Sequence, residues 1–166
     1  MMTLCSDVLK ALSGKTLATA ESLTGGGIGS AITAVSGSSA VFKGGIISYC
    51  NEIKHKLLGV DETVLDTFGA VSAPVAEAMA AGARRVLDAD VAVSVTGLAG
   101  PGGDEFGNPV GTVFVGYADD KAVFSRRFLF EGSRESIRKQ TIEAALRLVL
   151  QRNSQCKGAR YVLFEN

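Results

Sequence analysis

The stretch ATAESLTGGG, Ala18 to Gly27, constrains the fold more than any other part of the chain. An alternating pattern over Lys15 to Glu21 predicts a strand. Apolar residues at helical spacing follow the glycines, at Ile28, Ile32 and Val35, and predict a helix. Backbone N–H groups at the start of such a helix attract anions, and the helix dipole favours negative charge there. This strand–turn–helix junction therefore predicts a site for a phosphate or an oxyanion.

Helix and strand patterns alternate along the rest of the chain, with one hairpin near the C-terminal end. Helices are predicted over residues 3–13, 51–60, 61–69, 73–89 and 134–151. Strands are predicted over residues 45–50, 90–97, 110–118 and 122–130, the last two joined by a short turn at 119–121. This order predicts an α/β fold, a three-layer α/β/α sandwich with a mixed sheet of about five strands.

Composition excludes several classes of protein. Lys plus Arg equals Asp plus Glu at 17 each, so the chain has no overall charge that would attract a nucleic acid. Residues 22–42 carry no charge, but twelve of these 21 are Ser, Thr or Gly, which argues against a membrane span. The three cysteines, Cys5, Cys50 and Cys156, match no metal or redox spacing, and we expect Cys50 to be a small buried residue. We expect a cytoplasmic protein.

Unusual residues follow three predicted strands: Ser22, Tyr49 and the pair Thr96-Gly97. Ligands of open α/β sheets bind beyond the carboxyl ends of the strands, so we expect these residues to converge. A serine nucleophile needs a base, and the residues nearest in type are His55 and Lys54. By residue type alone, both are more simply solvated groups on a helix whose inner side chains are Ile53, Leu57 and Leu58.

Two further segments have both a structural and a functional interpretation. Residues 97–111 contain six glycines and two prolines, which predicts either a flexible crossover or a loop whose backbone approaches a ligand. Arg138 and Gln140 begin the last helix and are either solvated or in contact with an acidic substrate. The formal phosphate-binding and nucleophile-elbow motifs are absent, and the S-x-x-K match at 154–157 is too loose to carry weight.

Eight short motifs in order resemble the C-terminal domain of the CinA (competence/damage-inducible) family. They are AES-x-TGG (20–26), GSS (37–39), SY-x-NE-x-K (48–54), LGV (58–60), GAVS (69–72), TG-x-AGPGG (96–103), PVGTV (109–113) and SR-x-x-IR-x-Q (133–140). The resemblance covers roughly residues 3–152. It implies a three-layered fold with a mixed five-stranded sheet, and hydrolysis of the carboxamide of nicotinamide mononucleotide (NMN) to nicotinate mononucleotide and ammonia, in pyridine nucleotide recycling.

The resemblance also implies a reaction that needs no metal and no cofactor, and it implies roles for individual residues. Ser22 would be the nucleophile, Lys54 its base and Tyr49 a supporting group. The oxyanion and substrate pocket would be lined by Thr24, Gly25, Gly26, Ser39, Thr96, Gly97, Ala99, Gly100, Arg138 and Gln140. Leu23 stands where many members have Cys, and the nucleotide pyrophosphatase-type domain that usually precedes this one is not part of the sequence.

We therefore expect one amidohydrolase domain over residues 1–152 and an unassigned tail over 153–166. The expected partners are a small nucleotide substrate and further copies of the chain in a dimer or larger homo-oligomer. Two alternatives remain open at this point. One is a catalytically silent nucleotide-sensing or protein-interaction module with the same fold, and the other is an amidohydrolase that acts on a different pyridine or nucleotide amide.

Overall fold

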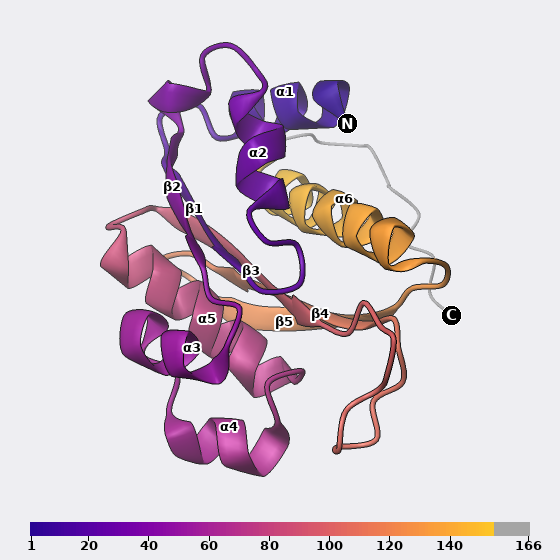
Figure 1. Ribbon diagram of the computed structural model, residues 1–166. Helices are drawn as coiled ribbons and strands as arrows, with labels where there is room; N and C mark the ends of the chain where they lie inside the picture. The colour runs from indigo at the N-terminus through magenta and orange to yellow at the C-terminus, as the bar shows by residue number, and fades with distance from the viewer. Residues whose placement is uncertain (155–166) are drawn as a thin grey trace.

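The computed structural model describes residues 1–154, which form a central five-stranded sheet covered by helices on both faces (Figure 1). The order across the sheet is β2-β1-β3-β4-β5. Its strands are β1 (Leu17–Glu21), β2 (Phe42–Ile47), β3 (Val91–Gly97), β4 (Thr112–Ala118) and β5 (Val123–Leu129). The three-layer α/β/α sandwich with a mixed five-stranded sheet is confirmed.

The direction of the strands brings the carboxyl ends of several strands to one edge of the sheet. Strand β1 pairs in parallel with both β2 and β3, whereas β4 is antiparallel to β3 and to β5. The carboxyl ends of β1, β2 and β3 therefore lie at the same edge. Because the hairpin reverses the chain twice, β5 also ends there.

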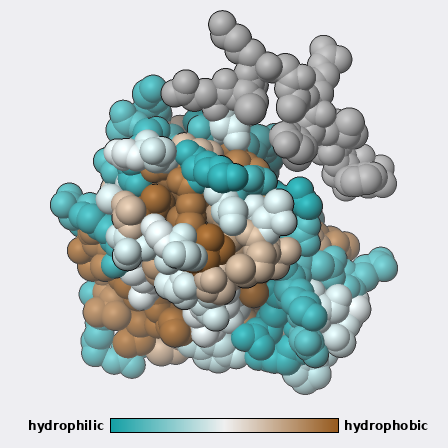
Figure 2. Space-filling view, turned by 90° about the horizontal axis from the view of Figure 1, so that it is seen from above, coloured by the Kyte–Doolittle hydropathy of each residue, from teal (hydrophilic) through white to brown (hydrophobic). Residues whose placement is uncertain are grey.

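Three helices lie on each side of the sheet (Figure 1). One face carries α1 (Met2–Ala11), α2 (Gly27–Thr33) and α6 (Arg134–Asn153), and the other carries α3 (Asn51–Leu58), α4 (Glu62–Phe68) and α5 (Ala73–Val86). A short 3-10 turn, Ser38–Ala40, joins α2 to β2. On the face seen from above, hydrophobic residues gather near the centre and lower left, and hydrophilic residues lie at the lower right (Figure 2).

Alternation along β3 divides the core into two layers. Val91, Val93 and Val95 pack with α1, α2 and α6, whereas Ala92 packs under α5. The α5 side of the sheet is lined by small residues so that this helix approaches closely. A Cβ on Gly116 of β4, for example, would lie 2.2 Å from the Ala76 carbonyl oxygen. Alternate burial of this kind fixes which face of each strand meets which helices.

Most predicted elements are present, with shifted ends. The last helix begins as expected, because the Ser133 side chain accepts a hydrogen bond from the Ser136 N–H. Helix α3 has Cys50 at its N-cap position, so Asn51 is its first helical residue. The second strand was expected over 45–50, but it runs from Phe42 to Ile47. Its two glycines resemble a turn in sequence, although Gly45 pairs with Thr19 of β1.

Candidate active site

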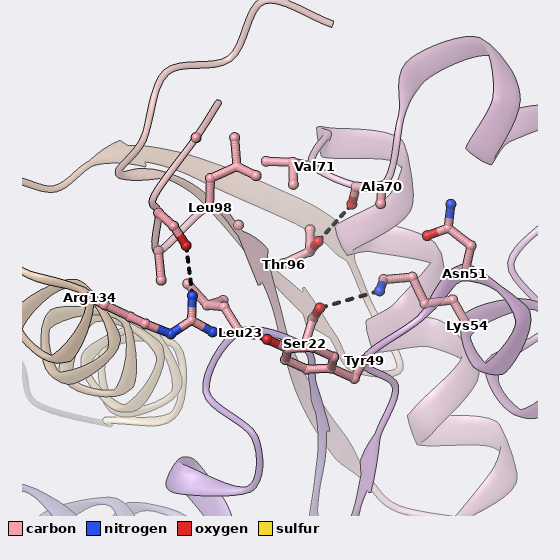
Figure 3. A pocket seen from close by; sticks show the side chains of 14 residues that line it. Ser22, Leu23, Tyr49, Asn51, Lys54, Ala70, Val71, Thr96, Leu98 and Arg134 are labelled. Carbon is pink, nitrogen blue, oxygen red and sulfur yellow. Dashed lines mark hydrogen bonds between the residues drawn. The ribbon is translucent and has the colours of Figure 1, made fainter. Parts of the chain in front are cut away.

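A pocket of about 260 Å³ opens at the edge where β1, β2 and β3 end (Figure 3). It is smaller than the roughly 300–1,000 Å³ of sites that enclose drug-sized ligands. Residues at or after the ends of all three strands and the first residue of α6 contribute to it. The lining residues are Ser22, Leu23, Tyr49, Asn51, Lys54, Ala70, Val71, Thr96, Gly97, Leu98, Ala99, Gly100, Gly102 and Arg134.

Ser22 and Lys54 meet in this pocket. Lys54 Nζ lies 3.3 Å from Ser22 Oγ and donates a second hydrogen bond, of 2.8 Å, to the Ser48 carbonyl oxygen. The Ser22 side chain follows β1 directly, and its backbone N–H donates to the Val95 carbonyl of the neighbouring strand β3. The hydroxyl is therefore held by the sheet, and the amine is oriented by a backbone carbonyl.

Burial changes the chemistry of Lys54. The residue is 1% exposed, and removal of its amine from water lowers the pKa of Lys54 from an ordinary value of 10.5 to about 8. A neighbouring Cys50 opposes this lowering. About a tenth of the Lys54 side chains are then neutral at pH 7, and the neutral amine can accept a proton. A buried lysine with such a pKa is a candidate general base.

Helix α3 turns Lys54 inward, contrary to what residue type alone indicates. Lys54 and Leu58 are the buried side chains of this helix, whereas Leu57, expected to face inward, is 48% exposed. His55 is exposed and its ring Nδ1 lies 2.8 Å from the Val60 carbonyl oxygen. The single histidine therefore takes no part in the pocket.

Among the described residues, no hydrogen bond joins Tyr49 to the Lys54 amine. Its hydroxyl accepts a hydrogen bond of 2.9 Å from Arg134, whose other terminal nitrogen donates to the Gly100 carbonyl oxygen at 2.8 Å. These three residues come from the end of β2, the start of α6 and the loop after β3 (Figure 3). Tyr49 thus lies at the mouth of the pocket, 62% exposed, and the support for Lys54 comes from the Ser48 carbonyl.

At the junction before α2, the first N–H groups of the helix bind the carboxylate of Glu21, a residue of the same chain. The Glu21 carboxylate, 1% exposed, accepts hydrogen bonds from the backbone N–H groups of Ile28 and Gly29 and from the Thr24 hydroxyl. The amides that we expected to face a substrate phosphate are therefore occupied by a buried carboxylate. Gly26, the N-cap residue, has φ 94°, which explains the glycine there without a ligand.

The loop after β3 contributes backbone to the pocket, as its glycines indicated. Gly97, Ala99 and Gly100 line it together with Thr96. The Thr96 hydroxyl donates a 2.6 Å hydrogen bond to the Ala70 carbonyl oxygen, which joins the end of β3 to the segment before α5. This bond joins two segments of the pocket wall.

Six of the residues expected at the site lie outside the pocket wall: Thr24, Gly25, Gly26, Ser39, Arg138 and Gln140. Arg138 is turned toward the junction after β1, where it donates to the Leu23 and Thr24 carbonyl oxygens at 3.0 and 2.8 Å. Gln140 donates to the Glu131 carbonyl oxygen and to the Ser136 hydroxyl. Ser39 is exposed in the 3-10 turn. Arg138 therefore shapes the backbone beside Ser22 rather than the cavity.

Arg134 and Asn51 line the pocket although sequence reasoning missed them. Both stand within the matched motifs, Asn51 three residues before Lys54 and Arg134 four residues before Arg138. Helical spacing puts Arg134 and Arg138 on one side of α6 and cannot tell which of them reaches the pocket. That choice depends on how far the helix extends past the sheet edge.

Cys50 is exposed, so the prediction of a small buried residue is wrong; of the two cysteines that the structure describes, Cys5 is the buried one. Cys156 and most of the S-x-x-K match at 154–157 lie outside the described residues. Within residues 1–154, no three His, Cys, Asp or Glu side chains cluster in a way that would hold a metal ion. Over the same range, no helix is long and apolar enough to cross a membrane.

Comparison with known proteins places the chain in a family. The family model described as the CinA C-terminal domain matches residues 2–153. The chain belongs to the CinA family. A curated relative from Pseudomonas putida, named nicotinamide-nucleotide amidohydrolase PncC, is 50% identical over 133 residues, which is 80% of this chain and 83% of that protein. A relative from Endomicrobium trichonymphae, named CinA-like protein, is 50% identical over 135 residues.

The two relatives differ in length. This CinA chain spans most of the Pseudomonas protein but only 32% of the Endomicrobium protein, although the match covers 81% of the chain itself. A solved structure of competence damage-inducible protein A from Klebsiella pneumoniae is 32% identical, with a TM-score of 0.88 over 90% of this chain and 94% of that one. CihA, a competence/damage inducible protein from Agrobacterium tumefaciens, is 37% identical with a TM-score of 0.85 over 91% of this chain and 96% of that one.

Proposed function

We propose that the chain hydrolyses the carboxamide of NMN to nicotinate mononucleotide and ammonia. The observation that carries this proposal is the buried pair of Ser22 Oγ and Lys54 Nζ, 3.3 Å apart in a pocket. A serine beside a lysine whose pKa is lowered by burial is suited to attack on an amide carbon. The 50% identity with a protein named nicotinamide-nucleotide amidohydrolase supports this choice of amide.

The first chemical step forms a bond between Ser22 Oγ and the carboxamide carbon. Neutral Lys54 takes the serine proton as the bond forms, and the carbonyl oxygen of the substrate becomes an oxyanion. The Lys54 ammonium then returns the proton to the amide nitrogen, so the carbon–nitrogen bond breaks and ammonia leaves. Water attacks the remaining ester, with Lys54 again as the base, and releases the carboxylic acid and the free serine.

Backbone geometry next to Ser22 supports stabilisation of the oxyanion. The Leu23 N–H, which follows the nucleophile directly, forms no hydrogen bond with an acceptor in the described residues 1–154. The Leu23 carbonyl oxygen, which belongs to the next peptide group, accepts a hydrogen bond from Arg138. An N–H held in place by its surroundings stabilises developing negative charge more than a mobile one. We therefore assign the Leu23 N–H to the oxyanion.

The proposal places this chemistry in one domain, residues 1–152, that works as a homo-oligomer and contributes to pyridine nucleotide recycling. The test is incubation of purified protein with NMN. We expect ammonia in a coupled assay and an equal amount of nicotinate mononucleotide by mass spectrometry.

Two other results would contradict the proposal in different ways. Binding of NMN without ammonia release would indicate a nucleotide-sensing module. Faster release from other pyridine amides than from NMN would indicate an amidohydrolase of another specificity.

A further inference from the structure

We infer that Arg134 is a specificity-determining residue that binds a phosphate monoester of the substrate at the mouth of the pocket. This inference rests on the proposed function, since it names the part of NMN that lies away from the reacting carboxamide. Arg134 forms no part of the chemistry assigned to Ser22 and Lys54. Its role is to select nucleotides over nucleosides.

The charges around the pocket favour an anion. Among the described residues, its wall contains two basic side chains, Lys54 and Arg134, and no Asp or Glu side chain. Arg134 takes part in none of the ion pairs formed among residues 1–154. The adjacent Glu135 is instead paired with Lys139, at 3.6 Å. No carboxylate of residues 1–154 therefore pairs with the positive charge of Arg134 at the rim of the cavity.

The guanidinium is held in position by neutral acceptors. Arg134 donates one hydrogen bond to the Gly100 carbonyl oxygen and one to the Tyr49 hydroxyl. A guanidinium has five N–H donors, so three remain for a ligand. Two fixed bonds orient its planar fork, and such a fork matches the oxygens of a phosphate. A site organised in this way before binding loses less side-chain entropy when the ligand arrives.

The position of Arg134 in its helix is unfavourable unless the side chain has another purpose. It is the first residue of the 20-residue helix α6, after the cap Ser133. The N-terminal end of a helix carries partial positive charge, which favours acidic residues and disfavours basic ones. Residues that break a local rule of this kind concentrate at functional sites. A bound phosphate would interact favourably with both the guanidinium and this end of α6.

The two cations approach the pocket from opposite sides (Figure 3). Lys54 extends from α3 and Arg134 from the start of α6, with Ser22 between the two helices. A substrate whose carboxamide lies at Ser22 therefore meets Arg134 with a part of the molecule other than the group beside Lys54. In NMN the phosphate is that part, and in nicotinamide riboside it is missing.

The test compares NMN with nicotinamide riboside in the wild type and in Arg134→Gln. We expect the variant to raise KM for NMN by at least about tenfold with little change in kcat, and to leave kcat/KM for the riboside unchanged. Arg134→Lys keeps the charge but not the fork, and its KM should fall between the two. Arg127→Gln removes an exposed arginine of β5 and serves as the control. An equal loss with both substrates, or no loss with NMN, would overturn the inference.

A binding experiment separates this inference from the proposed function. Calorimetry of NMN with wild type and Arg134→Gln needs no turnover, and inorganic phosphate is added as a competitor. Weaker NMN binding by the variant, with competition by phosphate only in the wild type, supports the inference even if no ammonia is released. Equal binding by both proteins overturns it even if NMN is hydrolysed. Circular dichroism of each variant confirms that it is folded.

Discussion

Lys54 Nζ lies 3.3 Å from Ser22 Oγ although 32 positions of chain separate the two residues. Parallel pairing of β1 with β2 brings them together, because Ser22 follows the first strand and α3 begins just after the second. The pair is also buried, at 8% and 1% exposure. Proximity and burial act together, since the same loss of water that shelters the hydroxyl also lowers the pKa of the amine.

Replacement of Ser22 by Ala should reduce ammonia release from NMN by at least about 1,000-fold, because no other hydroxyl is bonded to Lys54 among the described residues. The free energy of unfolding should change by less than about 1 kcal/mol, since only one oxygen is removed. A coupled ammonia assay and urea denaturation measure the two quantities. Ser30→Ala, an exposed serine on α2, is the control. Turnover at the wild-type rate in Ser22→Ala would refute the nucleophile.

The pH dependence of kcat/KM should follow the titration of Lys54. The active form is the neutral amine, so activity should rise about tenfold per pH unit below the pKa of about 8 and level off above it. Measurements between pH 6.5 and 9.5 stay above the second pKa of a phosphate monoester, roughly 6. Lys54→Arg should be inactive throughout, because a guanidinium stays protonated. A flat profile over this range would exclude Lys54 as the base.

Burial of Lys54 should also make the wild type less stable at neutral pH than a variant without the charge. The pKa of Lys54 is about 8 in the folded protein and has its ordinary value of 10.5 in the unfolded chain. Between pH 8 and pH 10.5 the unfolded chain therefore binds more protons than the folded protein. Stability should therefore rise by up to about 3 kcal/mol as the pH increases from 8 to 10.5.

The variant Lys54→Met removes the charge and should gain roughly 1–3 kcal/mol in the free energy of unfolding at pH 7, even though it loses the bond to Ser48. Urea denaturation at pH 7 and pH 9.5 tests both statements. The matched control is Lys56→Met, an exposed residue on the same helix paired with Glu52. If both variants change stability alike, burial of Lys54 carries no cost.

Glu21→Gln should lower the free energy of unfolding by roughly 2–4 kcal/mol. The carboxylate accepts hydrogen bonds from two N–H groups of α2 and from the Thr24 hydroxyl, and an amide can turn only one oxygen toward these donors. Glu62→Gln, in the exposed first turn of α4, is the matched control and should change little. Denaturation midpoints in urea compare the two. Equal losses would mean that the buried charge contributes nothing beyond an exposed one.

The architecture was accessible from sequence because its signals are local. The apolar run of β3 and the short 119–121 connection each report on a neighbouring stretch of chain. Strand β2 was displaced by three residues in the prediction, because Gly44 and Gly45 have no apolar side chain to mark a strand. A Cβ on Gly45 would lie 2.3 Å from Thr19 Oγ1. That close contact between strands is a tertiary requirement and leaves no pattern in the segment itself.

The site was accessible only in part. Ser22 and Thr96 stand at strand ends, where topology predicts a ligand, but the inward turn of Lys54 contradicts its residue type. The family resemblance, rather than periodicity, singled out Lys54. The resemblance named Arg138, whereas Arg134 is the arginine that lines the pocket. The hydrogen bonds from the α2 N–H groups to the Glu21 carboxylate were also missed. A glutamate before a glycine-rich turn can equally be exposed to solvent or bound to the first N–H groups of the following helix.

The hairpin of β4 and β5 has a consequence for how this protein tolerates change in length. The chain reverses direction twice after Gly97, once at the start of β4 and once at the start of β5. It therefore returns to the edge of the sheet where β3 ends, and Arg134 lies there although it follows Gly97 by 37 positions. Adding matched pairs of residues to both arms would extend the ribbon away from the catalytic end and leave that arrival point intact. Deleting either β4 or β5 would instead make the final helix begin at the opposite edge of the sheet, and Arg134 would then lie far from the pocket.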